Sequence, residues 1–458
     1  IGAVVSVRGT TTGTITDVDG GFTLQVSPPL ASAILAISCV GYESASVTVG
    51  NQTHFNVTLP DKNIVLSDVV VTAFGIERSK KALSYNVQEI TSGDIVGVKD
   101  ANFINALNGK VAGVNINASS SGVGGASKVV MRGSRSIEQS SNAFYVIDGI
   151  PMNNVTRTGG TEFDSAGSSD FLADINPEDI ESISILTGAS AAALYGSSAA
   201  NGAIVVTTKK GAIGKTSITI TQNTEFLKPF VKYDFHNRYG TSASDTNMSW
   251  GNRLKNNYMG YDPYKDYFTT GAVTTESVAL STGNDKNQTY FSAAVVNSDG
   301  IIPNNEYNRY NFTFRNTTSF LNDKMTLDIG ASYIKQNDLN MTSQGVYSNP
   351  IAAAYLYPRG NDWENVKMFE QYDVQRKIYT QNWDMAPGEY VLQNPYWVNY
   401  RNLRENKKDR YMLNAGLNYK VLDWLTLSGR VRLDDSQEKS TKKYYATTNT
   451  QLTENSTN

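Results

Sequence analysis

Apolar and polar side chains alternate along much of the second half of the chain. From Tyr411 to Val421, every second residue is apolar or aromatic, and the residues between them are mostly small or polar. A period of two over eleven residues has the length and pattern of a strand that crosses a membrane with one face toward lipid. Tyr411 and Tyr419 would lie roughly 26 Å apart along such a strand. With a tilt of about 40° this spans roughly 20 Å of the membrane normal, close to the apolar band between two aromatic girdles.

The same alternation recurs in six further segments, so seven strands are expected between residues 212 and 458. The six segments lie near residues 215–223, 274–282, 288–297, 310–315, 325–333 and 425–434. In the last of them Arg430, Arg432 and Asp434 share one face. Charges on an inward face favour a water-filled lumen over a packed core.

The predicted connections between these strands are unequal in length. They are short at 283–286, 321–324 and 421–424, and longer elsewhere, most of all between residues 340 and 408. Short turns at one end and long loops at the other are typical of an outer-membrane β-barrel, with a soluble β-sandwich as the alternative. The smallest such barrels have eight strands, so the chain is expected to be part of a longer protein.

Residues 1–60 are predicted to form a small β-sandwich. Strands are expected at 13–17 and 22–26, joined by the turn Asp17-Val18-Asp19-Gly20-Gly21, and then at 34–40, 44–49 and 54–59. The Asp-x-Asp-Gly quartet lacks the further ligands of a calcium loop, so a plain hairpin is favoured. Cys39 lies in an apolar run and is expected to be buried.

A linker is predicted for residues 61–90, with an extended segment inside it. Three consecutive β-branched residues, Val69, Val70 and Val71, favour a strand. This strand either belongs to a core or is exposed and pairs with the sheet of a partner protein. Its position between a linker and the basic stretch around Lys80 favours the exposed strand.

Residues 91–211 are predicted to form a mixed α/β unit. Asp100 is expected to cap a helix that carries Phe103, Leu107 and Val111 on one face. Strands are expected at 143–147 and 180–186, with a tight turn at Asp148-Gly149 and a turn at Asn201-Gly202 that leads into residues 203–208. A short helix is expected at 189–194 before Gly196.

Composition narrows the possible chemistry. The chain has 458 residues and a formal net charge of −3, which gives no basis for a nucleic-acid partner. His54 and His236 lie in different regions, so no catalytic triad, metal site or cofactor is predicted, and the protein is not expected to be an enzyme. The apolar stretch near 30–41 is too short for a membrane helix. The start Ile1-Gly2-Ala3 shows no signal-peptide charge, so a mature or trimmed N-terminus is expected.

The long connection at 340–408 carries three of the chain's five tryptophans, Trp363, Trp383 and Trp397. Aromatic faces next to polar side chains suit sugar rings or peptide side chains. These tryptophans are therefore candidates for substrate binding. The alternative is that they pack the loop against itself or against a partner protein.

Several motifs together resemble the SusC/RagA family of TonB-dependent transporters from Bacteroidota. The segment Asp68–Gly75 with Lys80-Lys81-Ala82-Leu83-Ser84-Tyr85 is similar to the family's TonB box and its continuation. Further matching motifs are Asn108–Val114, Met131-Arg132-Gly133, Tyr145–Pro151, Ala191–Gly196 and Ala200–Gly211. Residues 1–60 resemble the carboxypeptidase-regulatory-like domain that precedes the plug, without that domain's usual first strand.

The resemblance implies a mainly β protein with four parts. These are a small β-sandwich (1–60), a linker with the TonB box (61–90), an α/β plug domain (91–211) and the first strands, about seven of 22, of a transmembrane antiparallel β-barrel (212–458). It places the protein in the lipid of the Gram-negative outer membrane. The TonB-binding residues would be Asp68, Val69, Val70, Val71, Thr72 and Ala73. Plug-loop candidates for substrate contact are Arg135, Asn142, Asn153, Asn154 and Arg157.

The implied function is TonB-dependent import of an oligosaccharide with a SusD-like surface lipoprotein, and a dimer of transporter–lipoprotein pairs is a further possibility. Import of peptides, a siderophore or cobalamin receptor of the same architecture, and a non-transporting adhesin or sensor remain alternatives.

Overall fold

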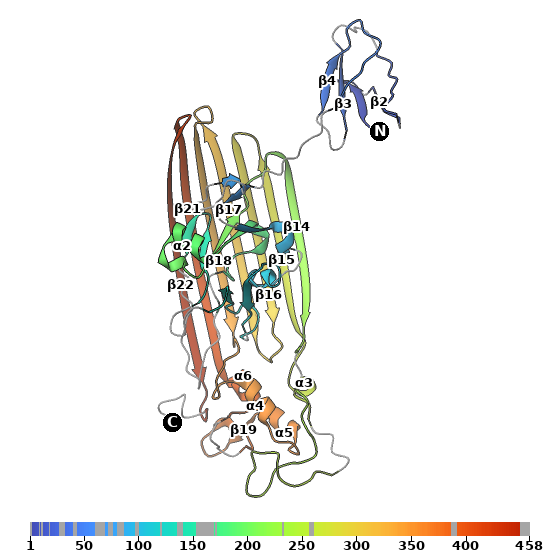
Figure 1. Ribbon diagram of the computed structural model, residues 1–458. Helices are drawn as coiled ribbons and strands as arrows, with labels where there is room; N and C mark the ends of the chain where they lie inside the picture. The colour runs from blue at the N-terminus through green and yellow to red at the C-terminus, as the bar shows by residue number, and fades with distance from the viewer. Residues whose placement is uncertain are drawn as a thin grey trace. The chain divides into compact units, whose positions relative to one another are not determined.

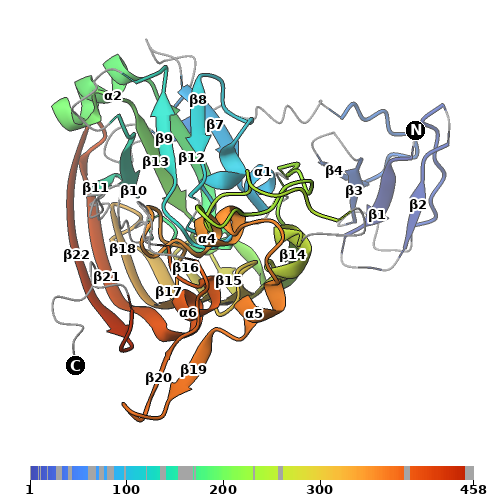
Figure 2. The same cartoon turned by 90° about the horizontal axis from the view of Figure 1, so that it is seen from below.

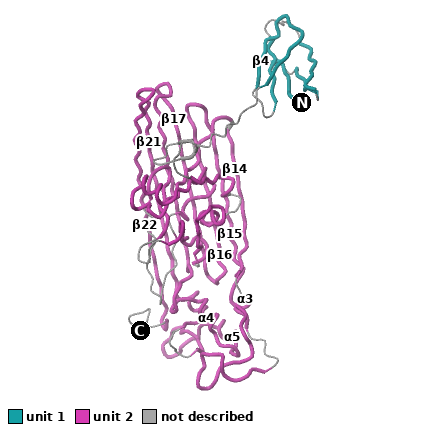
Figure 3. The backbone as a smooth tube through the Cα atoms, in the orientation of Figure 1, with its two compact units in different colours: residues 1–69, 78–83 teal, residues 70–77, 84–458 magenta. Residues whose placement is uncertain are grey.

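The structure, a computed structural model, describes residues 2–448 apart from gaps at 9, 11, 18, 27–32, 40–43, 60–68, 72–76, 80–86, 97–99, 120, 135–140, 153–168, 170–171, 231–232, 256–260 and 386–391. The chain divides into two compact units, which are coloured separately in Figure 3. The first holds residues 1–69 and 78–83, and the second holds residues 70–77 and 84–458.

The first unit contains one four-stranded antiparallel sheet with the order β2-β1-β3-β4. Its strands are β1 (Val4–Val7), β2 (Gly13–Ile15), β3 (Ile34–Ser38) and β4 (Ala45–Thr48). Side chains that alternate inward from the two central strands form the core, among them Val5 and Leu35. The central strand β1 lies in a segment for which the sequence pattern predicted no element.

The second layer of this unit is irregular chain. Residues 22–26 and 54–59 were predicted as strands, and the structure assigns no strand to either. Their apolar side chains nevertheless pack on the core, as do Phe22 and Phe55, and Cys39 is partly buried beside them. The strand prediction is wrong here because alternation reports which side chains are buried, not whether the backbone finds a pairing partner.

A separate two-stranded sheet joins β5 (Val69–Val71) and β6 (Glu77–Ser79). The predicted exposed strand is therefore extended at residues 69–71. The other three residues of the predicted TonB box, Asp68, Thr72 and Ala73, lie outside the described residues.

Within the second unit, residues 87–211 form a mixed unit, here called the central unit, around a five-stranded sheet with the order β11-β10-β13-β12-β7. Its strands are β7 (Val87–Thr91), β10 (Phe144–Ile147), β11 (Ile150–Met152), β12 (Ile180–Leu186) and β13 (Ala203–Thr208). β10 and β13 run parallel, and the other pairs are antiparallel. Ile183, Ile204 and Val206 are fully buried in its core.

Smaller elements complete the central unit. They are α1 (Ser92–Val96), the hairpin of β8 (Val114–Asn117) with β9 (Lys128–Met131), α2 (Gly188–Tyr195) and 3₁₀ turns at Asn105–Leu107, Pro177–Asp179 and Ser197–Ala199. The helix predicted after Asp100 is wrong, because the chain makes only a 3₁₀ turn there. Gly109 and Gly113 adopt φ of 76° and 74°, which breaks any continuation. The predicted face is still buried.

The seven predicted barrel strands are confirmed as one antiparallel sheet, here called the wall sheet, with the order β14-β15-β16-β17-β18-β21-β22. The strands are β14 (Gly214–Leu227), β15 (Gly271–Gly283), β16 (Asn287–Asp299), β17 (Glu306–Phe320), β18 (Met325–Leu339), β21 (Asn402–Leu422) and β22 (Leu425–Tyr444). Figure 2 shows the wall sheet curving around one side of the central unit.

The two faces of the wall sheet differ as the alternation predicts. Outward side chains such as Leu413 and Val431 are exposed, whereas Asn311 and Arg315, which alternate with Phe312 and Phe314, are buried against the central unit. An apolar face without protein cover next to a polar inner face is the pattern of a membrane barrel.

The connections define two ends of the wall sheet. Short turns follow β15, β17 and β21 at the turn end, and the long connections gather at the loop end, where Figure 1 shows α4, α5 and α6. The loop-end elements, here called the loop cap, are α3 (Pro263–Asp266), α4 (Pro350–Leu356), α5 (Trp363–Lys367), α6 (Pro395–Arg401) and the hairpin of β19 (Glu370–Asp373) with β20 (Ile378–Gln381). No helix in the described ranges is long and apolar enough to cross a membrane.

Candidate functional site

The candidate site is the contact between the central unit and the inner face of the wall sheet. Ion pairs join the wall to the central unit at two places, and an apolar patch holds it at a third. Buried charges cost free energy unless they are paired and hydrogen-bonded. The partners of each charge therefore show how the contact is held.

Arg315 on β17 binds both the wall and the central unit. Its Nε and Nη2 donate to the two carboxylate oxygens of Asp328 on β18, at 2.9 and 2.7 Å. Its Nη1 donates to Thr208 Oγ1 at 2.6 Å and lies 3.4 Å from Asp148 Oδ1 in the central unit. A fork of this kind fixes direction as well as distance.

A hairpin turn explains why Asp148 stands at this place. Asp148 and Gly149 connect β10 to β11 with φ of 49° and 80°. Asp-Gly favours two-residue turns of this conformation. Thr208 on the neighbouring strand β13 donates to the Asp148 carboxylate through its backbone N at 2.9 Å and its Oγ1 at 2.8 Å. The turn predicted from sequence thus carries a carboxylate to the wall.

A second buried charge cluster joins the central unit to β21 and β22. Asp174 has no exposed side-chain surface and lies 2.6 Å from Lys408 Nζ and 2.8 Å from Arg410 Nη1. Arg410 also donates from Nε and Nη2 to the carboxylate of Asp434 on β22, each at 2.8 Å. Arg432 Nη2 also lies 3.3 Å from Asp434, so the cluster contains three cations and two carboxylates.

Hydrogen bonds from β16 and β17 complete the polar contact. Arg309 donates to the backbone oxygens of Ala101, at 2.8 Å, and of Ala173. Asp179 accepts from the hydroxyls of Tyr290 at 2.9 Å and Thr313 at 3.0 Å. Burial raises the pKa of Asp179, and the hydroxyl donors around it offset only part of this effect.

An apolar patch, here called the seat, holds the central unit at the loop end of β14 to β17. It consists of Ala101, Val123, Leu227, Val273, Val296 and Tyr307. Gly124 (φ 73°) lies so close to the Tyr307 ring that an added Cβ would fall 2.2 Å from Cε2. Only glycine allows this approach.

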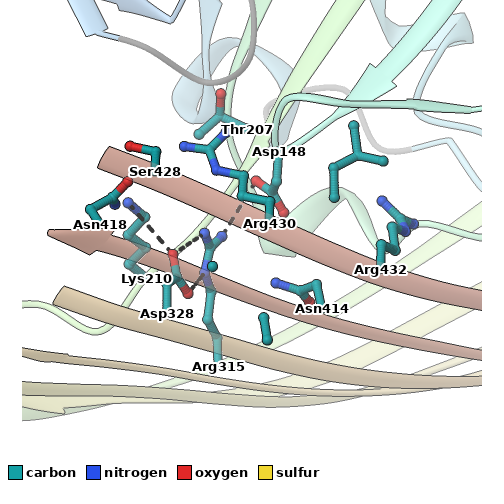
Figure 4. A pocket seen from close by; sticks show the side chains of 13 residues that line it. Asp148, Thr207, Lys210, Arg315, Asp328, Asn414, Asn418, Ser428, Arg430 and Arg432 are labelled. Carbon is teal, nitrogen blue, oxygen red and sulfur yellow. Dashed lines mark hydrogen bonds and ion pairs between the residues drawn. The ribbon is translucent and has the colours of Figure 1, made fainter. Parts of the chain in front are cut away.

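A polar cavity of about 360 Å³ opens between the central unit and the turn-end half of β18, β21 and β22. Figure 4 shows Lys210 and Arg315 meeting at Asp328, with Arg430 and Arg432 facing the same space. This cavity, here called the turn-end cavity, is lined by Asp148, Ile150, Thr207, Lys210, Arg315, Asp328, Asn414, Ala415, Gly416, Asn418, Ser428, Arg430 and Arg432.

The three tryptophans predicted to bind substrate lie in the loop cap. Trp363 is 4% exposed and stacks on Tyr261 with ring centroids 4.4 Å apart. Trp397 is fully buried, and its Nε1 donates to Thr448 Oγ1 at 3.1 Å. Trp383 is half-buried against Tyr357. The loop packs on itself at these positions, so their contact with a ligand stays a prediction.

Of the other predicted substrate residues, the structure describes only Asn142. Arg135, Asn153, Asn154 and Arg157 lie outside the described residues. Asn142 pairs with Val130 of β9 inside the central unit. Within the described ranges, no group of three or more His, Cys, Asp and Glu side chains is arranged to hold a metal ion.

Sequence reasoning missed the ion pairs between the central unit and the wall. Arg315 and Asp148 are 167 residues apart, and Arg410 and Asp174 are 236 apart. The one available signal was the occurrence of charged residues on inward strand positions, which predicted a wet lumen but no partners.

Two family models match the chain. The TonB-dependent receptor plug domain matches residues 79–203, which include most of the central unit, and a CarboxypepD_reg-like domain matches residues 1–71.

Similar proteins extend over most of the chain. It is 28% identical over 436 residues to the TonB-dependent receptor SusC of Bacteroides thetaiotaomicron, which is 92% of this chain and 41% of that protein. It is 30% identical to the TonB-dependent receptor P3 of Formosa agariphila, over 93% of this chain and 39% of that protein. In fold it matches the RagAB peptide importer in its closed-closed state, with a TM-score of 0.57 and 18% identity, over 80% of this chain and 43% of that one. The chain spans about two fifths of the length of the curated relatives it matches.

Proposed function

The chain belongs to the SusC/RagA-like TonB-dependent receptors, and from this premise we propose that the protein imports an oligosaccharide across the outer membrane of a Gram-negative bacterium. Energy would come from TonB and its inner-membrane complex. A SusD-like surface lipoprotein would deliver the cargo at the loop end. The central unit is called the plug from here on.

One observation carries this proposal. The plug lies on the polar inner face of a sheet whose outer face is apolar, and buried ion pairs hold it there. A plug that was only a structural core would be held equally well by apolar side chains, which often replace buried ion pairs without loss of stability. Ion pairs favour one docked position of the plug. When water enters, it solvates the separated charges and lowers the cost of release, as a plug that moves during transport requires.

The coupling to TonB is proposed at β5. Among the described strands β5 pairs only with β6, so its other edge is available to a third strand, and edge pairing gives affinity through main-chain hydrogen bonds. The chain then runs to β7, which is the outer strand of the plug sheet and pairs only with β12 among the described strands. Force on the segment 74–90 would therefore act first on an edge strand.

Growth experiments test the proposal. A strain that lacks the full-length gene is grown on single oligosaccharides, peptides or chelated iron sources. We expect a growth defect on one class of oligosaccharide. A defect on peptides or on iron sources would instead support the peptide importer or the siderophore receptor.

Deletion of Asp68–Ala73 separates transport from adhesion or sensing. Uptake should be lost while the receptor remains on the cell surface, as measured with an antibody against an extracellular loop. A matched deletion in the linker at 61–66, before β5, is the control and should leave uptake intact. Uptake that persists without residues 68–73 would contradict energised transport.

A further inference from the structure

We propose that the turn-end cavity is a second cargo site, through which cargo leaves toward the periplasm, and that it binds the acceptor oxygens of cargo, carboxylates above all. The inference rests on the proposed function, since it concerns the route of the imported molecule. It adds a site that is distinct from any binding site at the loop end.

The cavity and the seat lie at opposite ends of the contact between the plug and the wall sheet. The seat closes the loop end of β14 to β17 with apolar contacts that leave no space for a Cβ at Gly124. The cavity lies at the opposite corner, at the turn end of β18, β21 and β22. A plug that is packed closely at one corner and borders a polar cavity at the other opens with least rearrangement at the cavity.

Hydrogen-bond donors, most of them cationic, dominate the lining of the cavity. Four cationic side chains (Lys210, Arg315, Arg430 and Arg432) and two carboxylates (Asp148 and Asp328) line it. Arg432 also pairs with Asp434 at 3.3 Å, so an excess of one positive charge remains. Asn414 and Asn418 add amide groups. Such a surface offers many donors and attracts anionic cargo.

Two buried polar atoms point to a ligand independently of the charges. Arg432 Nε and Thr207 Oγ1 are buried without a hydrogen-bond partner among the described residues, and both residues line the cavity. The Arg432 side chain is only 10% exposed. A buried donor without a partner costs free energy, which an acceptor oxygen in the cavity would recover.

The cavity also continues into the plug contact. A smaller space of about 60 Å³ shares Asp148, Arg315, Asn414 and Arg432 with it and extends to Asp174 and Asp179. The two spaces together follow the polar contact between the plug and β17, β18 and β21. Release of the Arg315 and Arg410 ion pairs would join them into one path along this part of the wall.

A bulky side chain in the cavity tests the route. Ser428 on β22 lines the cavity and pairs with Asn418 on β21. In the full-length receptor, Ser428→Trp should lower the uptake of the oligosaccharide found in the growth experiment by at least about tenfold. Binding of that oligosaccharide to the purified receptor–lipoprotein complex should not change.

Thr219→Trp is the matched control. Thr219 lies at the other edge of the wall sheet on β14, on the face opposite to the exposed Ile218 and Ile220. It should leave uptake unchanged. Equal losses in both variants would show a general disturbance of the barrel and overturn the route, as would normal uptake by Ser428→Trp.

Charge removal tests the chemistry of the cargo. Arg430 lies across Gly416, with its Cγ 3.5 Å from where a Cβ of that glycine would be. Arg430→Gln should lower the uptake of a uronic-acid oligosaccharide or of an acidic peptide by about tenfold, relative to a neutral oligosaccharide or peptide. Comparing acidic sugar with acidic peptide identifies the source of the carboxylate. Equal uptake ratios in the variant and the wild type would overturn the carboxylate preference.

The two hypotheses fail in different ways. If loss of the whole gene, or of residues 68–73, changes growth on no source, the proposed function is wrong. If the wild type transports and Ser428→Trp transports equally well, only the exit site is wrong.

Discussion

Replacing Asp174 by Asn tests whether buried charges hold the plug in place. Asp174 is fully buried between Lys408 and Arg410, at 2.6 and 2.8 Å. Asparagine keeps the volume and removes the charge, so both cations lose a buried counter-charge. Removing one partner of a buried pair costs about 3–5 kcal/mol. Because Arg410 keeps its two bonds to Asp434, the lower end, about 3 kcal/mol, is expected.

Hydrogen exchange of the full-length receptor measures this cost. The amides of β12 report local opening of the plug, and a loss of about 3 kcal/mol corresponds to exchange that is roughly 150-fold faster. Glu364→Gln removes the exposed pair with Lys367 in the loop cap and is the matched control. An exposed pair contributes at most about 1 kcal/mol, so β12 exchange should be unaffected by this change.

The double variant Asp174→Asn with Lys408→Met tests whether the cost of Asp174→Asn comes from the uncompensated charge of Lys408. Asp174→Asn is expected to be costly because it leaves a buried cation without a counter-charge. Removing Lys408 as well should then restore part of the protection of the β12 amides against exchange, by about 1 kcal/mol or more. Unchanged exchange in Asp174→Asn, or equal exchange in the single and double variants, would show that the ion pairs do not hold the plug.

Three further changes probe the wall and the plug separately. Val431→Arg places a charge on the exposed outer face of β22 and should destabilise the barrel in vesicles by about 2–4 kcal/mol in a urea titration. Gly202→Ala puts a Cβ 2.3 Å from Met131 Sδ at φ 101°, so the plug should lose more than about 1 kcal/mol in the same exchange measurement. The raised pKa of Asp179 means that the docked plug favours the protonated carboxyl. Its contribution is complete below the ordinary Asp pKa and is lost as pH rises through the raised value. Asp179→Asn should therefore flatten the pH dependence of plug exchange in that window, and an unchanged profile would contradict this.

The wall sheet could be predicted from sequence because the alternation of apolar and polar residues within each strand shows which face is outward and which is inward. All seven strands were found from alternation, although β21 has 21 residues and the prediction covered eleven of them. The missing part, from Asn402 to Arg410, is polar or charged at nearly every position. Strand pairing continues there, beyond the predicted membrane-crossing part, without an apolar face, so the period that identified the strand disappears.

The site could be predicted only in outline. Arg430, Arg432 and Asp434 indicated a wet inner face, but the contacts of Arg315 with Thr208 and Asp148 depend on how a separate unit docks. Docking leaves no local pattern in either segment. The same limit applies to the loop cap. Sequence alone could not show whether Trp397 packs in a core or contacts a ligand, because aromatic residues are common in both places.

The contrast between the seat and the ion pairs explains how a plug can be both stable and releasable. Apolar contact at the seat loses free energy gradually with the area exposed, so it tolerates small rotations. The fork of Arg315 on Asp328, with its reach to Thr208, depends on distance and direction, so it weakens sharply when the plug shifts. Water entering from the turn-end cavity then solvates the separated charges and lowers the cost of separation. In the proposed mechanism, a pull on β7 would therefore have to break the ion pairs only once, and the seat would act as the pivot for the return of the plug.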